Sequence, residues 1–257
     1  MDLSEPLVMG ILNVTPDSFY AGSRVQTEAE IAGRARQIVD EGGAIIDVGA
    51  CSTRPGSEPA TETEEMERLR MGLAVVRREV PAAVVSVDTF RPDVARMAVE
   101  EFGAAIVNDV SGSESMFRVA SRLGVPYVLT SSQPTLRQTL LFFAEAVQQL
   151  RDMGQKDIIL DAGFGFGKTV EQNYELMGGM EQMLALGLPL LVGVSRKSMI
   201  WRQLGTTPDD ALNGTTVLNT IALMKGASIL RVHDVKAAVD CITLTKKCLP
   251  VIKSLTV

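Results

Sequence analysis

Short apolar runs alternate with longer segments of helical periodicity along the whole chain. The runs are continuous rather than alternating in polarity, which is typical of strands that are covered on both faces in a parallel sheet. We expect strands at residues 7–12, 44–48, 83–87, 104–107, 126–129, 157–160, 189–192 and 228–230. The segments between them predict helices near 27–41, 61–79, 91–101, 115–122, 135–153, 171–186, 208–225 and 235–248.

Eight strand–helix units in 257 residues give about 32 residues per unit, the length of one βαβ repeat. No linker or low-complexity stretch divides the chain, so we expect one domain over residues 1–257. Such units either close into a (β/α)₈ barrel or spread into an open doubly wound sheet, which would concentrate its ligand groups at one switch point. Here polar residues follow nearly every apolar run: Asn13, Asp47, Asp88, Asn108, Asp161, Ser195 to Lys197, and Arg231 to His233. This distribution favours an α/β fold of the single-domain TIM-barrel type, with the site at the carboxyl ends of the strands.

Composition and charge narrow the class of protein. With 25 basic and 31 acidic residues the net charge is −6, which disfavours binding to nucleic acid through its phosphates. No apolar run is long enough to span a membrane, and the first residues lack the features of a secretory signal. The three cysteines, Cys51, Cys241 and Cys248, have no metal-ligand spacing. We therefore expect a cytoplasmic protein with reduced thiols.

A glycine-rich segment follows the sixth apolar run and ends in Gly167-Lys168-Thr169. It is not a phosphate-binding loop, because that motif needs a glycine five positions before Gly167, where Ala162 stands. An ordinary strand–helix turn and a loop that lets backbone approach a ligand closely both remain open.

Three polar side chains, Asp88, Asn108 and Asp161, each follow an apolar run. Burial of such groups is costly unless they find hydrogen-bond donors. Two carboxylates and an amide at one barrel mouth would suit a planar heterocycle with N–H and NH₂ groups, such as an aminopyrimidinone. The alternative is that each residue caps the following helix or ties down a loop.

Basic residues at three strand ends predict a local anion site in this acidic protein. Arg54, Lys197 and Arg231 supply the positive charges, and arginine offers a fork that matches phosphate oxygens. His233, the one histidine of the chain, lies two residues after Arg231 and is either a packed residue or a further anion contact. The amide of Asn13 could complete a Mg²⁺ shell made mainly of phosphate oxygens and water.

Taken together, these segments resemble dihydropteroate synthase from Val8 to Val235. Seven stretches carry the resemblance in order: residues 9–19, Ser52-Thr53-Arg54-Pro55-Gly56, Ser86-Val87-Asp88-Thr89, Asn108-Asp109-Val110-Ser111-Gly112, Gly163-Phe164-Gly165-Phe166-Gly167-Lys168, Ser195-Arg196-Lys197-Ser198, and Arg231-Val232-His233-Asp234-Val235. No single stretch would suffice, but seven in order are highly specific.

The resemblance implies an enzyme of folate biosynthesis, a transferase that joins p-aminobenzoate to a dihydropterin methyl diphosphate and releases pyrophosphate. It implies a pterin site of Asp88, Asn108, Asp161, Lys197 and Arg231, and a diphosphate site with Mg²⁺ at Asn13, Arg54, Arg231 and His233. It implies a p-aminobenzoate pocket, open also to sulfonamides, of Thr53, Arg54, Pro55, Phe166, Lys197 and Ser198. The catalytic residues would be Asp88, Asp161, Lys197, Arg231 and His233, in a homodimer that forms through the last helices.

The sequence departs from the family after the fifth strand, where a Met-His-Met type segment is replaced by Leu129-Thr130-Ser131-Ser132-Gln133. It departs again at Ala162, where the family has proline. Two other functions therefore stay open. A pterin-binding methyltransferase would share the barrel but would not need the cluster of cations, and a non-catalytic pterin-binding homologue would fit the altered segment at 130–133.

Overall fold

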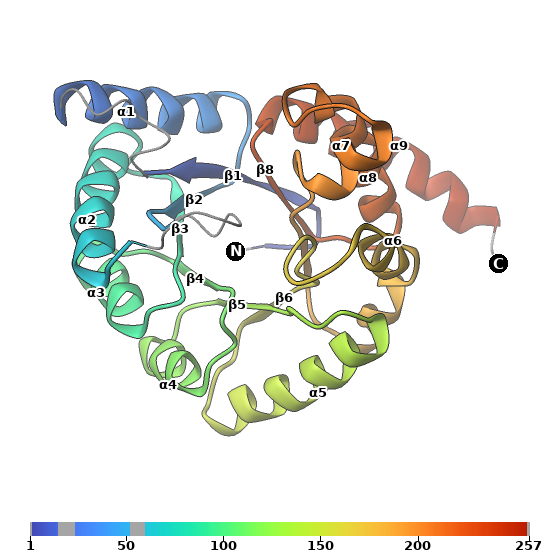
Figure 1. The fold of residues 1–257 in the computed structure, drawn as a ribbon, viewed down its shortest axis with the longest axis horizontal. Helices are drawn as coiled ribbons and strands as arrows, with labels where there is room; N and C mark the ends of the chain where they lie inside the picture. The colour runs from blue at the N-terminus through green and yellow to red at the C-terminus, as the bar shows by residue number, and fades with distance from the viewer. Residues whose placement is uncertain (1, 15–23, 52–59, 256–257) are drawn as a thin grey trace.

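A closed barrel of eight parallel strands forms the centre of the protein, with helices around it (Figure 1). The computed structural model describes residues 2–14, 24–51 and 60–255. The strands are β1 (Leu7–Asn13), β2 (Ile45–Gly49), β3 (Val84–Asp88), β4 (Ile106–Asp109), β5 (Tyr127–Thr130), β6 (Ile158–Asp161), β7 (Leu190–Val192) and β8 (Ile229–Val232). The helices are α1 (Arg24–Asp40), α2 (Glu62–Glu79), α3 (Pro92–Phe102), α4 (Glu114–Leu123), α5 (Leu136–Asp152), α6 (Val170–Gly178), α7 (Ser198–Leu204), α8 (Leu212–Met224) and α9 (Val235–Leu255), with 3₁₀ helices η2 (Met180–Leu186) and η3 (Asp209–Ala211).

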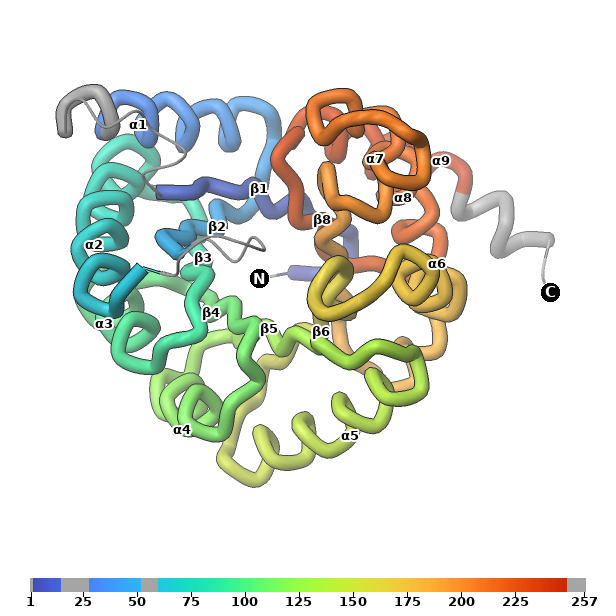
Figure 2. The backbone as a smooth tube through the Cα atoms, viewed as in Figure 1, coloured from blue at the N-terminus to red at the C-terminus, as the bar shows by residue number. Residues whose placement is uncertain are grey.

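Each strand pairs in parallel with its neighbours in sequence, and the last strand pairs with the first. Leu7 of β1 lies in register with Ile229 of β8, and Met9 with Ile45 of β2. The backbone trace shows this seam between the two ends of the chain (Figure 2). The predicted TIM barrel is therefore confirmed, and the doubly wound alternative is wrong.

Two apolar layers hold the barrel together, and the strands contribute to both. One buried cluster takes one residue from each of seven strands, namely Met9, Ile45, Ile106, Val128, Ile159, Leu191 and Ile229. The alternate residues, such as Val8, Ile46 and Val107, belong to a larger cluster with the helices. Because successive strand side chains point to opposite faces, the first cluster fills the barrel and the second lies between barrel and helices. This explains why the apolar runs are continuous.

Helix starts are encoded locally. Thr61 accepts from the backbone N–H of Glu64 while the Glu64 carboxylate accepts from the backbone N–H of Thr61, which is a capping box at the start of α2. Thr169 and Gln172 repeat this arrangement at the start of α6. These caps anchor the points where loops from the carboxyl ends of the strands return to helix.

The predicted helix over 171–186 is wrong as one element. It breaks at Gly179 into α6 and η2. A Cβ at position 179 would lie 2.3 Å from Leu136 Cδ2, so α5 packs directly against the break. Helix α7 was not predicted, because its seven residues directly follow the polar segment 195–197 that lies after β7.

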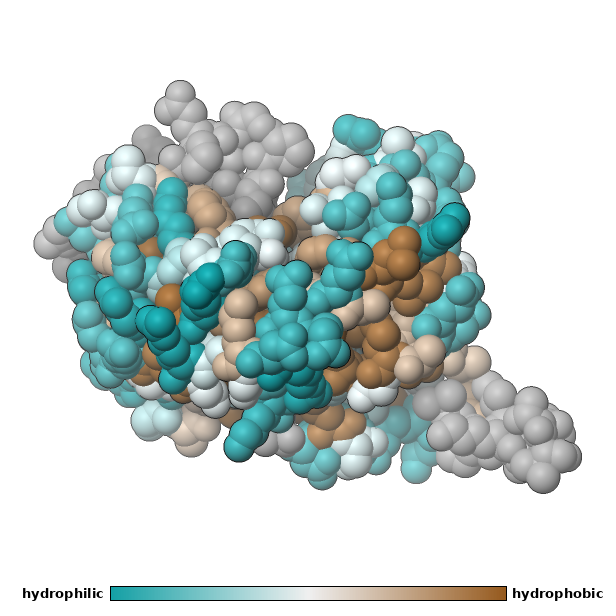
Figure 3. Space-filling model, turned by 90° about the horizontal axis from the view of Figure 1, so that it is seen from below, coloured by the Kyte–Doolittle hydropathy of each residue, from teal (hydrophilic) through white to brown (hydrophobic). Residues whose placement is uncertain are grey.

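The face formed by α4 and α5 is mainly polar, with apolar side chains between polar ones (Figure 3). Among the described residues, no helix has the length and apolar character needed to cross a membrane.

Candidate active site

An arginine from the last strand joins two acidic strands across the carboxyl end of the barrel. Arg231 Nε donates to Asp47 Oδ2 at 2.6 Å, and Arg231 Nη2 donates to Asp88 Oδ2 at 2.5 Å. Asn108 Nδ2 donates to the same Asp47 oxygen at 3.0 Å. β2, β3, β4 and β8 thus contribute one residue each to a single polar network.

Burial dominates the electrostatics of this network. Asp47 is fully buried, and its Oδ1 has no hydrogen-bond partner within the described structure. Burial raises the pKa of Asp88, and the charge of Arg231 opposes that rise. Burial alone would lower the pKa of Arg231, but Asp47 and Asp88 outweigh it and raise that pKa. The guanidinium is therefore fixed as a cation between two acids.

A second group of site residues lies at the ends of β6 and β7. Lys197 Nζ donates to the carbonyl oxygen of Phe164 at 2.5 Å and lies 4.8 Å from the centre of the Phe166 ring. Asp161 Oδ1 accepts from the backbone N–H of Gly163 at 2.8 Å. Burial lowers the pKa of Lys197 to about 8, and Asp161 opposes this shift. Burial likewise raises the pKa of Asp161, opposed first by Lys197.

The glycines after β6 are required by close contacts. A Cβ on Gly163, which has φ +68°, would lie 1.9 Å from the carbonyl oxygen of Ser131. A Cβ on Gly165, with φ +83°, would lie 3.1 Å from Lys197 Cδ. Positive φ favours glycine at both positions. The loop therefore lies against the end of β5 on one side and against Lys197 on the other.

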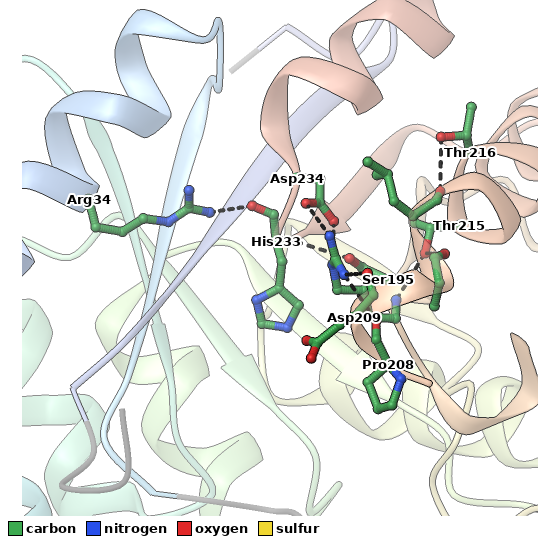
Figure 4. Close-up of polar contacts among 11 residues, drawn as sticks. Arg34, Ser195, Pro208, Asp209, Thr215, Thr216, His233 and Asp234 are labelled. Atoms are coloured by element: carbon green, nitrogen blue, oxygen red, sulfur yellow. Dashed lines mark hydrogen bonds and ion pairs between the residues drawn. The ribbon is translucent and has the colours of Figure 1, made fainter. Parts of the chain in front are cut away.

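The residue before Lys197 is held in an unusual backbone conformation. Arg196 has φ 54°, the one positive φ of a non-glycine residue in the described chain. Its guanidinium forms a bidentate ion pair with Asp234, with distances of 2.9 and 3.0 Å. Its Nη1 donates to the carbonyl oxygens of Pro208 and Asp209. These residues come together around the turn after β7 (Figure 4), and their contacts set the direction in which the chain enters Lys197.

The turn after β8 is also fixed through its backbone. The N–H of His233 donates to Ser195 Oγ at 3.1 Å, and its carbonyl oxygen accepts from Arg34 Nη2 at 2.5 Å. The imidazole points away from the Arg34 guanidinium (Figure 4). His233 is thus placed at the same end of the barrel as Arg231.

The structure brings most of the predicted site residues to one end of the barrel. Asp88, Asn108 and Arg231 join through Asp47, while Asp161, Lys197 and Phe166 form the second group. Asn13 ends β1, Ser198 begins α7, and His233 follows β8. Thr53, Arg54 and Pro55 lie outside the described residues.

Two charged residues were missed as members of the site. Asp47 was noted only as a polar residue at a strand end, yet it lies inside β2 and joins Arg231 to Asn108. An ionisable group within a continuous apolar run signals a buried partner, and that signal was present in Ile45-Ile46-Asp47-Val48. Lys168 belongs to the rejected phosphate-loop motif and to one of the stretches that carry the resemblance, but the sequence assigned it no role, although its ammonium group contacts the glycine-rich loop.

Comparisons with known proteins give the class. The model of the family described as "Pterin binding enzyme" matches residues 9–233. The chain therefore belongs to the pterin-binding enzymes.

The relatives within that class agree with one another. The chain is 39% identical over 241 residues to the dihydropteroate synthase of Bacillus subtilis, covering 90% of this chain and 84% of that protein. It is 36% identical over 266 residues to the Escherichia coli enzyme, covering 97% and 94%. The Xanthomonas albilineans dihydropteroate synthase with 4-aminobenzoic acid superposes with a TM-score of 0.91 at 33% identity, covering 97% and 95%. The Yersinia pestis enzyme in a sulfonamide drug complex gives 0.86 at 33% identity, covering 97% and 96%. The chain is a member of the dihydropteroate synthase family.

Proposed function

We propose that this protein is a transferase that condenses 6-hydroxymethyl-7,8-dihydropterin diphosphate with p-aminobenzoate to give 7,8-dihydropteroate and pyrophosphate. The observation that carries the proposal is the pairing of buried acceptors with cations at one barrel mouth. Asp47 and Asp88 both pair with the single positive charge of Arg231, and the charge of Lys197 acts on Asp161. The reaction would serve folate biosynthesis in the cytoplasm.

The acceptors suit the pterin ring. Asp88 and Asp161 end β3 and β6, and Asn108 is the next-to-last residue of β4. Their oxygens can accept from the N–H and NH₂ groups of an aminopyrimidinone. Lys197 supplies a donor, and Arg231, held by two carboxylates, offers a planar face for stacking.

The diphosphate would lie toward Asn13, Arg54, Arg231 and His233, with Mg²⁺. The described residues contain no group of three or more His, Cys, Asp or Glu side chains placed to hold a metal ion. A single amide ligand at Asn13 suits a Mg²⁺ that would take its remaining ligands from phosphate oxygens and water, because this ion usually keeps several waters. Bound there, Mg²⁺ would neutralise charge on the leaving group.

The residues support a dissociative displacement. The bond between the pterin methylene carbon and the diphosphate oxygen breaks, and its electron pair leaves with pyrophosphate. Arg231 and His233 stabilise that developing negative charge, while Asp88 and Asp161 favour positive character on the pterin. The amine of p-aminobenzoate then forms the C–N bond and loses a proton to water. Its pocket would be formed by Thr53, Arg54, Pro55, Phe166, Lys197 and Ser198.

Release of pyrophosphate, measured with and without p-aminobenzoate, tests the function. We expect release that depends on the arylamine and yields dihydropteroate. A protein that binds dihydropterin but releases no pyrophosphate would instead be a non-catalytic homologue, and methyl transfer without release would indicate a methyltransferase.

We also propose that the protein is a homodimer through α8. Val217, Ile221 and Met224 are 51%, 37% and 45% exposed, and their spacing of four and three residues puts them on one helix face. Val217→Glu with Ile221→Glu is expected to give monomers by light scattering. Leu141→Glu, at a leucine of α5 that is 54% exposed, serves as the control and is expected to leave the dimer intact. A wild-type chain that is monomeric at micromolar concentration would refute the proposal.

A further inference from the structure

The ammonium group of Lys168 lies among three backbone carbonyl groups. Nζ donates to the carbonyl oxygens of Ser131 and Gly163 at 3.0 Å each and to that of Phe166 at 3.2 Å. A lysine ammonium has three N–H donors and no acceptor, so these contacts use all of its hydrogen-bonding capacity. The side chain is only partly exposed, and burial lowers its pKa to about 8.

We infer that Lys168 is a positioning residue of the p-aminobenzoate site, which fixes the loop 163–167 against the end of β5 and thereby sets the place of Phe166 and Lys197. This inference rests on the function proposed above. The proposed reaction assigns no role to Lys168, and Lys168 acts on the pocket only through the loop.

The loop lies between two ammonium groups. Lys197 Nζ donates a hydrogen bond to the carbonyl oxygen of Phe164 and lies over the Phe166 ring. Both Lys197 and Phe166 belong to the proposed pocket. Lys168 donates to the carbonyl oxygens of Gly163 and Phe166. Consecutive carbonyl groups can point to two different cations only because Gly163, Gly165 and Gly167 have positive φ. The position of Lys197 therefore depends on a loop that Lys168 holds.

The contact with Ser131 makes this arrangement depend on charge. Ser131 is fully buried, and its carbonyl oxygen lies so near Gly163 that even a Cβ would not fit between them. Without the ammonium group, the carbonyl oxygen of Gly163 would keep the backbone N–H of Phe166 at 3.1 Å, but the carbonyl oxygen of Ser131 would lose its contact with Lys168. Leaving partly buried acceptors unsatisfied is costly, so the loop would move away from β5 and carry Phe166 with it.

The pterin side of the site depends less directly on the Lys168 ammonium group. Asp88 and Asn108 are held through Asp47 and Arg231, on β2, β3, β4 and β8. The other two pterin contacts, Asp161 and Lys197, touch the loop only at the Gly163 N–H and the Phe164 carbonyl oxygen, neither of which Lys168 contacts. Loss of the Lys168 ammonium is therefore expected to affect p-aminobenzoate much more than the dihydropterin substrate.

The test compares Lys168→Met with Lys168→Arg in the full chain, with Lys156→Met as the control. Lys156 is an exposed lysine just before β6, at the opposite end of the barrel. For Lys168→Met we expect the KM for p-aminobenzoate to rise about tenfold or more, as for the loss of a hydrogen bond to a charged group. The KM for the dihydropterin diphosphate should change less than about threefold by the same scale, and Lys156→Met should match wild type.

Lys168→Arg keeps the charge, but a planar guanidinium cannot converge on three carbonyl groups as an ammonium does. We expect it to raise the KM for p-aminobenzoate in the same direction by less, which keeps the test valid if Lys168→Met does not fold. Equal KM values for p-aminobenzoate in wild type and the folded variants would overturn the inference, as would an equal rise for both substrates. Absence of turnover in wild type would overturn the proposed function and this inference with it.

Discussion

Replacing Asp47 tests whether the network at the barrel mouth is held by charge or only by shape. Asp47 is fully buried, and one of its oxygens accepts from both Arg231 and Asn108. Asp47→Ala removes both contacts and leaves Arg231 paired with Asp88 alone. Asp47→Asn can keep an acceptor oxygen in place but removes the negative charge.

The structure sets the size of the two effects. Breaking a buried ion pair by removing one partner costs about 3–5 kcal/mol, and because Arg231 retains Asp88 we expect the lower end, about 3 kcal/mol, for Asp47→Ala. For Asp47→Asn we expect about 1–2 kcal/mol, since hydrogen bonds between neutral groups are roughly half as strong as those assisted by charge. Asp47→Ala should also weaken the binding of pterin more than Asp47→Asn does, because Asn108 loses its fixed orientation.

Urea unfolding and calorimetric titration with a pterin measure both effects. Asp157→Asn, at an exposed aspartate before β6, is the matched control and should change the free energy of unfolding by less than about 0.5 kcal/mol. If Asp47→Ala were as stable as this control and bound pterin with wild-type affinity, the network would be incidental to both fold and site.

Four other outcomes are expected. Asp88→Asn should stay folded and bind pterin about tenfold more weakly or worse by calorimetry, and unchanged affinity would remove Asp88 from the pterin site. Because burial lowers the pKa of Lys197 to about 8, kcat/KM for p-aminobenzoate should fall as pH rises through that value and the ammonium loses its proton; a flat profile to pH 10 would contradict this. Between that pH and the ordinary value of 10.5, the unfolded chain keeps a proton that folded Lys197 has lost, so wild type should gain stability relative to Lys197→Met as pH rises. Gly163→Ala should abolish activity and lower the Tm, because its Cβ would overlap the Ser131 carbonyl oxygen. Gly33→Ala, in α1 with no atom near the added Cβ, should instead stabilise the fold by about 0.5–1 kcal/mol. Equal Tm shifts in the two variants would refute the steric argument.

Local patterns predicted the barrel well because each strand is covered on both faces and reads as a continuous apolar run. The same patterns placed Asp88, Asn108 and Asp161 at strand ends. A polar residue directly after an apolar run can be assigned to a strand end from the local sequence alone. The break at Gly179 could not be predicted in this way, because it depends on Leu136 of another helix.

The missed site residues have the same physical origin. Asp47 and Arg231 are 184 positions apart, and the sequence does not show that β2 and β8 both flank β1. Lys168 acts on backbone carbonyl groups of residues 131, 163 and 166, and carbonyl groups carry no residue-specific signal. Strand periodicity therefore places side chains at the mouth but does not show which of them pair.

The placement of the single arginine that pairs with both Asp47 and Asp88 has a consequence for synthesis of the chain. Both acids are made in the first half of the sequence, but Arg231 comes from the last strand of the barrel. A nascent chain that ends before β8 therefore carries two carboxylates with no guanidinium between them, in a sheet that still has two open edges. Ionised, unpaired acids oppose burial, so the incomplete barrel is kept from settling into a dry core. Arrival of β8 supplies the pairing partner for β1 and the charge for β2 and β3 in one event, which couples closure of the barrel to completion of the site.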